Sequence, residues 1–76
     1  MAKLGKRIRE VRQRKGLSQS ELSRLSGIPR SLITNVEAGR RTLSLLNARA
    51  VARALGVSVD YLIGTFEPDD RKAAVA

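Results

Sequence analysis

Hydrogen-bonding side chains gather on one face of a short predicted helix that follows a glycine and a proline. They are Arg30, Ser31, Thr34 and Asn35. The apolar residues between them, Ile33 and Val36, fall on the other face of that helix and point inward. Guanidinium, hydroxyl and carboxamide groups donate and accept hydrogen bonds, but none of these residues is paired with an identifiable base. The set is therefore suited to recognition rather than catalysis. On an isolated helix, the same side chains could simply keep the surface soluble.

The chain is strongly basic. It carries 15 Lys and Arg residues against 7 Asp and Glu residues in 76 positions, which gives a formal net charge of +8. Such an excess predicts attraction to a polyanion, and nucleic acid is the first candidate. The basic residues are interleaved with periodic apolar residues, so we expect a charged face on a folded domain rather than a basic tail.

Two residue types that carry much of enzyme chemistry are missing, because the sequence contains no cysteine and no histidine. Disulfides and thiolate metal sites are therefore excluded, and the commonest general base is absent. We expect no cofactor, no metal and no enzymatic activity. No apolar run approaches the roughly 18 to 20 residues of a membrane span, and the charged start MAKLGKRIRE is unlike a signal peptide. The sequence predicts a cytoplasmic protein without a membrane partner.

The elements that position these residues are predicted to be five short helices, an all-α fold, because so short a chain buries only a modest core. Apolar periodicity, capping residues and glycines place them at about 4–15, 19–26, 30–38, 45–55 and 59–63. The predicted inward residues include Leu25 in the second helix and Leu45 in the fourth. We assign residues 1–66 to one domain and residues 67–76 to a flexible tail, with Phe66 packed back onto the body.

Local signals define the second helix and its surroundings. Ser18 to Glu21 has the form of a capping box, in which a hydroxyl and a carboxylate three residues later cap the helix start. Gly27 ends the helix after two turns, and Pro29 can stand at the start of the next one.

A family resemblance is carried by the run GLSQSELSRLSGIPRSLITNVEAGR and the later segment ALGVSVDYLIG. The sequence resembles the DNA-binding domain of the phage lambda repressor and Cro family, also called the xenobiotic-response-element helix-turn-helix family, over residues 4 to 64. The matching positions are Gly16, Ser18, Gln19, Leu22, Gly27, Ile28, Ile33, Glu37, Gly39, Leu55, Gly56 and Val57. The resemblance implies a compact five-helix lambda-repressor-like domain whose third helix enters the major groove while the second lies over the DNA backbone.

The resemblance also implies which residues contact DNA. The implied base-reading residues are Pro29, Arg30, Ser31, Thr34 and Asn35. Arg can bond guanine bidentately, Asn can pair with adenine, and Ser or Thr can bond either base. Pro29 stands where the family usually has a capping Ser or Thr, so it offers only its ring to a thymine methyl. The implied phosphate contacts are Ser18, Gln19, Arg40 and Arg41. We interpret most of the remaining basic residues, Lys3, Lys6, Arg7, Arg9, Arg14 and Arg24, as solvated charge, and Arg49 and Arg53 are unassigned.

Arg12 and Glu37 each follow an apolar residue by one helical turn, so they lie on or beside inward stripes. The family often has an arginine and a glutamate at these positions, linked as a buried salt bridge that orients the recognition helix. The resemblance implies the same structural pair here.

Several leucines depart from the family pattern. Leu32 replaces a small or polar residue and Leu43 replaces a proline; with Leu46 they predict an exposed apolar patch. Scattered surface leucine is the ordinary alternative. We favour a homodimer interface near the fourth and fifth helices, formed by Leu43, Leu46 and Tyr61, because a symmetric pair doubles the contacts to DNA.

Together these features predict a transcriptional regulator that binds double-stranded DNA as a homodimer on a pseudo-palindromic operator, as a repressor or autoregulator. The alternative is an adaptor or antitoxin that uses the same fold to bind RNA polymerase or another protein. High salt and the loss of Arg30 would leave binding by such an adaptor intact, whereas the loss of Leu46 would weaken it.

Overall fold

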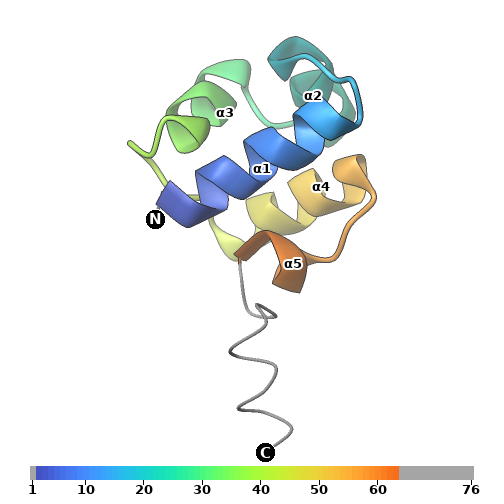
Figure 1. Cartoon of the computed structure of the whole chain (residues 1–76). Helices are drawn as coiled ribbons and strands as arrows, with labels where there is room; N and C mark the ends of the chain where they lie inside the picture. Colours follow the sequence, from blue (N-terminus) through green and yellow to red (C-terminus); the bar gives the residue numbers. More distant parts are fainter. Residues whose placement is uncertain (1, 64–76) are drawn as a thin grey trace, which may run out of the picture.

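The computed structural model describes residues 2–63, which form five α-helices (Figure 1). They are α1 (Ala2–Arg14), α2 (Gln19–Ser26), α3 (Arg30–Glu37), α4 (Leu45–Leu55) and α5 (Val59–Ile63). The all-α, five-helix fold predicted from the sequence is confirmed, and the predicted helix boundaries agree to within about two residues. The predictions for Phe66 and for residues 67–76 lie outside the described residues. None of the described helices has the length and apolarity needed to cross a membrane.

The helices enclose one apolar core. α1 runs across the middle of the molecule and packs against α3 and α5, whereas α2 packs against α3 and α4 (Figure 1). Every helix contributes to the core, and Ile28 adds to it from the connection between α2 and α3. The core cluster consists of Ile8, Val11, Leu22, Ile28, Ile33, Val36, Val51, Ala52, Leu55 and Leu62.

Four leucines differ from the sequence predictions. Leu25 and Leu45 were expected to point inward, yet they are 58% and 65% exposed. The two turns of α2 bury only Leu22, and Leu45 is the first residue of α4, whose buried residues begin at Ala48. Leu32 and Leu43 were expected in an exposed patch, but both are half-buried against the core. Periodicity gives a side chain's direction but not whether another element covers it.

The connection between α2 and α3 is held by backbone geometry and two serines. Gly27 adopts the left-handed conformation with φ of 76°, which turns the chain sharply after α2. Ser23 Oγ donates to the Ile28 carbonyl at 2.6 Å, and the Ile28 N–H donates to Ser26 Oγ at 3.2 Å. Ile28 is thereby held in the core at 5% exposure. This turn sets the angle between the two helices.

The start of α2 is a complete capping box, as the sequence predicts. Ser18 Oγ accepts from the Glu21 N–H at 3.0 Å, and the Ser18 N–H donates to Glu21 Oε1 at 2.8 Å. These bonds satisfy backbone donors that the first helical turn leaves unpaired. The hydrogen bonds from the Ser18 N–H and hydroxyl hold the pKa of Glu21 below its ordinary value of 4.5.

The lowered pKa of Glu21 predicts a pH-dependent cap. A carboxylate with a depressed folded-state pKa contributes stability that is present above the ordinary pKa and is lost as the pH falls through the folded-state value. We expect the stability difference between the wild type and Glu21→Gln to be constant near neutral pH and to shrink below pH 4.5. Urea denaturation at a series of pH values measures it. A difference that stays unchanged from neutral pH into the acid range would contradict the prediction.

Gly5 lies on α1 against the backbone of the last turn of α3. A Cβ atom at this position would collide with the carbonyl oxygen of Val36 and would stand 3.0 Å from Glu37 Cα. Both of these atoms belong to the backbone of α3, so they cannot move aside as the end of a flexible side chain would. The absence of a side chain at Gly5 therefore lets α1 approach the last turn of α3.

Candidate nucleic-acid interface

The outward face of α3 presents a polar surface. Arg30, Ser31 and Thr34 are exposed, whereas Asn35 is half-buried. Pro29 precedes the helix with φ of −55° and makes no side-chain capping bond, as expected for a residue without a hydroxyl. The inner face of the same helix buries Ile33 and Val36. The structure therefore brings the five predicted base-reading residues to one helix and its start, with the apolar side held by the core.

Beneath this surface, Arg12 of α1 and Glu37 of α3 form an ion pair, as the family resemblance implies. Arg12 Nε donates to Glu37 Oε2 at 2.7 Å and Arg12 Nη2 donates to Oε1 at 2.9 Å. The two side chains are only 11% and 4% exposed. Hydrogen bonds to Glu37 raise the pKa of the Arg12 guanidinium above its usual value, against the opposing effect of burial. A third bond, from Arg12 Nη1 to the Leu17 carbonyl at 2.8 Å, ties the pair to the segment before α2.

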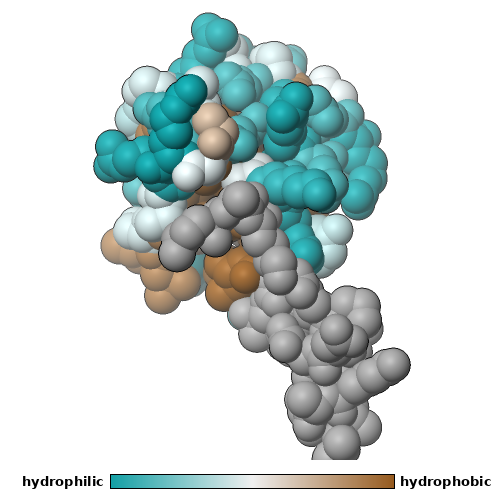
Figure 2. Space-filling model, turned by 60° about the vertical axis from the view of Figure 1, so that its left-hand side comes forward, coloured by the Kyte–Doolittle hydropathy of each residue, from teal (hydrophilic) through white to brown (hydrophobic). Residues whose placement is uncertain are grey.

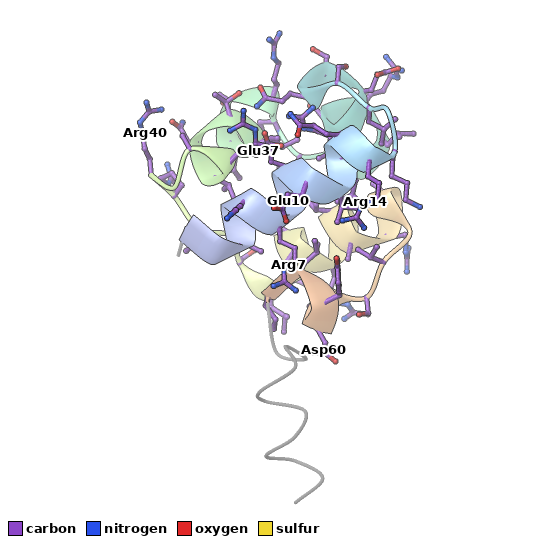
Figure 3. All side chains as sticks on the ribbon, viewed as in Figure 1. Arg7, Glu10, Arg14, Glu37, Arg40 and Asp60 are labelled. Atoms are coloured by element: carbon purple, nitrogen blue, oxygen red, sulfur yellow. The ribbon has the colours of Figure 1, made fainter. Side chains whose placement is uncertain are left out.

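Gln19 extends the ion pair to the outer face of α3. Its Nε2 donates to Glu37 Oε1 at 3.0 Å, and its Oε1 accepts from the Thr34 hydroxyl at 2.8 Å. In Figure 3, Glu37 lies between α3 and α1, at the centre of this arrangement. The predicted phosphate ligand Gln19 is thus part of an internal network that joins α1, α2 and α3. One N–H of its amide group is left for an outside partner.

Asn35 and Arg40 are also joined within the chain. Arg40 Nη1 donates to Asn35 Oδ1 at 3.2 Å, and the Arg40 N–H donates to the Asn35 carbonyl at 2.9 Å. The Arg41 N–H reaches the same carbonyl at 3.3 Å. Figure 3 shows Arg40 at the outer end of the connector that follows α3. Asn35 would have to exchange the Arg40 bond for a base in order to pair with adenine through both amide atoms.

The other two predicted phosphate contacts are Ser18 and Arg41, of which only Ser18 has a side chain that makes a capping bond. The Ser18 hydroxyl already accepts the capping bond of α2, although the residue itself is exposed. Arg41 is exposed after the end of α3. A hydroxyl that accepts one bond can still donate to a phosphate oxygen, and a guanidinium donates from several atoms, so both residues keep donors for phosphate.

Two further residues, which the sequence reasoning did not assign to DNA, share a shallow hollow with this network. Arg9 and Gln13 of α1 line it together with Gln19, Thr34 and the ion pair. Arg9 was interpreted as solvated charge because a helix has several basic faces. Its position three residues before Arg12 is the signal that could have placed it beside the buried pair.

Arg7 and Tyr61 connect the opposite side of α1 to α5. Arg7 Nη1 donates to the Tyr61 carbonyl at 3.0 Å, and its guanidinium lies 5.0 Å from the Tyr61 ring centroid. Figure 3 shows Arg7 pointing from α1 toward α5. Arg7 therefore holds the two helices together and is not merely solvated charge. Tyr61, predicted at a dimer interface, is 36% exposed and partly occupied by this cation–π contact.

Apolar side chains remain exposed where α4 begins and α5 ends. Leu45 is 65% exposed, Leu46 is 74% exposed and Ile63 is 44% exposed. On the face shown in Figure 2, hydrophilic colour covers the upper part, and brown apolar residues gather at the lower end. In Figure 1 that level holds the start of α4 and α5. In the described part of the chain, the exposed large apolar residues of α4 and α5 are Leu45, Leu46, Tyr61 and Ile63, and we call this set the apolar patch.

Comparison with known proteins identifies the arrangement of α2, turn and α3. The family model described as helix-turn-helix matches residues 8–62. The chain belongs to the helix-turn-helix family. As a helix-turn-helix protein it is a DNA-binding protein of the transcriptional-regulator class, and α3 occupies the position of the recognition helix in this motif.

Curated relatives of this helix-turn-helix chain are regulators. An immunity repressor protein of Bacillus phage phi105 is 34% identical over 61 residues, which are 80% of this chain and 42% of the repressor. An HTH-type transcriptional regulator of Methanothermobacter thermautotrophicus is 47% identical over 49 residues, which are 64% of this chain and 71% of that protein. The regulator PuuR of Escherichia coli is 30% identical over 71 residues, and the match spans 38% of its length. The chain therefore spans less than half of two of these relatives.

Solved structures of similar proteins share the fold. The restriction-modification controller protein C.AhdI of Aeromonas hydrophila has 46% identity and a TM-score of 0.77, over 80% of this chain and 92% of that chain. The hypothetical transcription factor NHTF of Neisseria has 36% identity and a TM-score of 0.79, over 96% of this chain and 82% of that chain. The helix-turn-helix chain is therefore similar over most of its length to a restriction-modification controller protein and to a hypothetical transcription factor.

Proposed function

We propose that this chain is a sequence-specific regulator that binds double-stranded DNA as a homodimer on a pseudo-palindromic operator and acts as a repressor or autoregulator. The observation that carries the proposal is the exposed polar face of α3, which the largely buried Arg12–Glu37 pair joins to α1 and which Gln19 joins to α2. A surface that must match base edges needs such a rigid support, because small displacements break hydrogen bonds. The similarity to an immunity repressor and to a restriction-modification controller supports a regulatory role.

In this proposal the contacts divide into two classes. Arg30, Ser31, Thr34 and Asn35 read base edges in the major groove, together with the ring of Pro29. Phosphate contacts come from Gln19, through its remaining amide N–H, and from Ser18, Arg40 and Arg41. The net charge of +8 supplies a salt-dependent attraction to any DNA.

Selection of bound duplexes from a random DNA library tests this function. We expect a palindromic winner with half-site centres about 34 Å apart, bound at least about 10³-fold more tightly than scrambled DNA and with steep salt dependence. Weak binding that enriches no sequence would contradict the proposal, because it would mean that the basic charge is generic.

Arg30 and Arg41 separate the two contact classes. We expect Arg30→Ala to cost about 1 to 3 kcal/mol of binding to the selected operator and to relax the preference at one base pair. Arg41→Ala should weaken binding to all sequences alike and lower the salt slope by about 1. Titrations of operator and scrambled duplex at several salt concentrations measure both effects. Equal losses on both duplexes for Arg30→Ala would remove Arg30 from base reading.

The homodimer is proposed to form through the apolar patch, since Leu46 is the most exposed large apolar residue in residues 2–63. We expect Leu46→Glu to weaken dimerisation at least about tenfold, because a two-fold interface would bury the added charge twice. The stability of the Leu46→Glu monomer should be unchanged, because Leu46 is 74% exposed. Sedimentation equilibrium without DNA measures the dissociation constant. Ser20→Glu, which adds the same charge at an exposed position on α2, is the control, and equal effects from both variants would contradict an interface at this patch.

A further inference from the structure

We infer that Gln19 sets the hydrogen-bonding polarity of Thr34, so that the Thr34 hydroxyl meets DNA only as an acceptor and selects a base that carries an exocyclic amino group. The inference rests on the proposed function, because it takes Thr34 to face base edges in the major groove. It adds a positioning role for Gln19, which acts through Thr34.

The direction of these hydrogen bonds is set first by the ion pair between Arg12 and Glu37. The guanidinium of Arg12 can only donate, and it donates to both carboxylate oxygens of Glu37, at 2.7 and 2.9 Å. Both oxygens of Glu37 are thereby acceptors of guanidinium N–H groups, and a carboxylate can only accept hydrogen bonds. Any neighbour that approaches Glu37 within hydrogen-bond distance must therefore present a donor.

The side-chain amide of Gln19 is oriented by this requirement, because it hydrogen-bonds both Glu37 and Thr34. The amide group that faces Glu37 Oε1 at 3.0 Å must be the NH₂, because a carbonyl oxygen there would repel the carboxylate. The amide carbonyl is thereby turned to the other side, where it lies 2.8 Å from Thr34 Oγ1. The orientation of the amide thus follows from the charge of the ion pair.

The orientation of the Gln19 amide in turn fixes the direction of the Thr34 hydroxyl proton at the surface. A hydroxyl has a single proton, and at Thr34 that proton is directed to the Gln19 carbonyl. Thr34 is exposed, so the lone pairs of Oγ1 remain available to an outside partner, but only as acceptors. A threonine with a freely rotating hydroxyl could instead donate or accept.

The base edges of the major groove respond differently to an acceptor. Adenine presents an N6 amino donor and cytosine an N4 amino donor, whereas guanine presents N7 and O6 and thymine presents O4 as acceptors. An acceptor-only Thr34 is compatible with adenine or cytosine and opposes guanine or thymine. Each base pair carries one such amino group, so Thr34 selects which strand holds it.

The test compares base preferences selected by the wild type, Gln19→Met and Thr34→Val. In the wild type, the position at which Thr34→Val loses selectivity should favour adenine or cytosine by about five- to tenfold, the value of one net hydrogen bond. Gln19→Met is a helix former of similar length without an acceptor, so it frees the hydroxyl proton. In Gln19→Met we expect the preference for adenine or cytosine to drop to about twofold or less, at that position only. Loss of a phosphate contact by Gln19 would lower all affinities alike and leave the ratios unchanged.

Matched variants control for a general structural effect. Gln13→Met makes the same change in the same hollow on α1 and should retain the preference. Thr34→Ser keeps the hydroxyl and should retain it as well. A double variant, Gln19→Met with Thr34→Val, should show no further change at that position. The wild type alone provides a second test, in which the contacted adenine is replaced with unsubstituted purine, or the contacted cytosine with 2-pyrimidinone. Either replacement removes the amino group and should weaken binding about five- to tenfold.

The outcomes separate this inference from the proposed function. A wild type that selects an operator while Gln19→Met keeps the full preference would overturn the inference and leave the proposed function standing. Selection of guanine or thymine at the Thr34 position, or no loss of affinity with the base that lacks the amino group, would overturn it as well. A wild type that selects no sequence would overturn both.

Discussion

Glu37→Ala is expected to lower the free energy of unfolding by about 3 kcal/mol, because it leaves the largely buried Arg12 guanidinium without its counter-charge. Arg12 is 11% exposed and donates to Glu37 from two nitrogens, so water cannot replace the carboxylate easily. The truncation also removes the acceptor of the Gln19 amide at 3.0 Å. Urea or thermal denaturation measures the loss.

Two variants make the test of the ion pair specific. Glu10→Ala removes a carboxylate from the exposed face of α1 and should change stability by no more than about 0.5 kcal/mol. The double variant Arg12→Met with Glu37→Leu removes both charges and should lose less than Glu37→Ala, because no unpaired charge remains. An unchanged melting temperature for Glu37→Ala would show that the pair does not stabilise the fold.

Gly5→Ala is the second prediction with a large effect, and its sign opposes helix propensity. In the interior of an unobstructed helix, replacing glycine with alanine stabilises by up to about 1 kcal/mol. At Gly5, the new Cβ would collide with the Val36 carbonyl oxygen, and α1 and α3 would have to separate. We expect a net destabilisation of about 3 kcal/mol from this overpacking.

Denaturation of Gly5→Ala beside Lys6→Ala provides the comparison. Lys6 is the next residue of α1 and is exposed, so its replacement should change stability by no more than about 0.5 kcal/mol. A Gly5→Ala protein as stable as the wild type, or more stable, would mean that α1 and α3 do not approach as closely as the structure shows. Weakened operator binding should accompany the destabilisation, because α3 is displaced with its outward residues.

Gly5 and Arg12, the two residues of α1 concerned, both contact the end of α3. Gly5 lets α1 approach the backbone of α3 at Val36 and Glu37, and Arg12, seven residues further along α1, holds the Glu37 side chain. Both contacts act on the last turn of α3, immediately before the connector that carries Arg40 and Arg41. Both contacts therefore tie the recognition helix to α1, in addition to its connection to α2 through the turn at Gly27.

Much of the local structure was predictable because its causes lie within a few residues. The capping box from Ser18 to Glu21, the turn at Gly27 and the end of α4 at Gly56 each depend on hydrogen bonds or dihedral angles of neighbouring positions. The outward direction of Arg30, Ser31 and Thr34 likewise follows from helical periodicity. Family resemblance, rather than local pattern, led to the pairing of Arg12 with Glu37.

Burial and side-chain partners were predicted less well. Leu25 and Leu45 continue apolar stripes but are exposed, because no neighbouring helix covers the end of the stripe on which each lies. The bond between Gln19 and Thr34 joins residues 15 positions apart, and the contact of Arg7 with Tyr61 joins residues 54 positions apart. Such contacts depend on how whole helices pack, to which the residues themselves give little local signal.

The sequence by itself determined the number and limits of the helices, the basic character of the molecule and the polar face of α3, because these follow from composition, periodicity and capping. The tertiary structure alone decided that Gly5 is a point of contact and that Gln19 lies between Glu37 and Thr34. It also decided which leucines remain exposed. The physical reason is that hydrogen-bond direction, close approach and burial are properties of pairs of elements, and they exist only once the helices have packed.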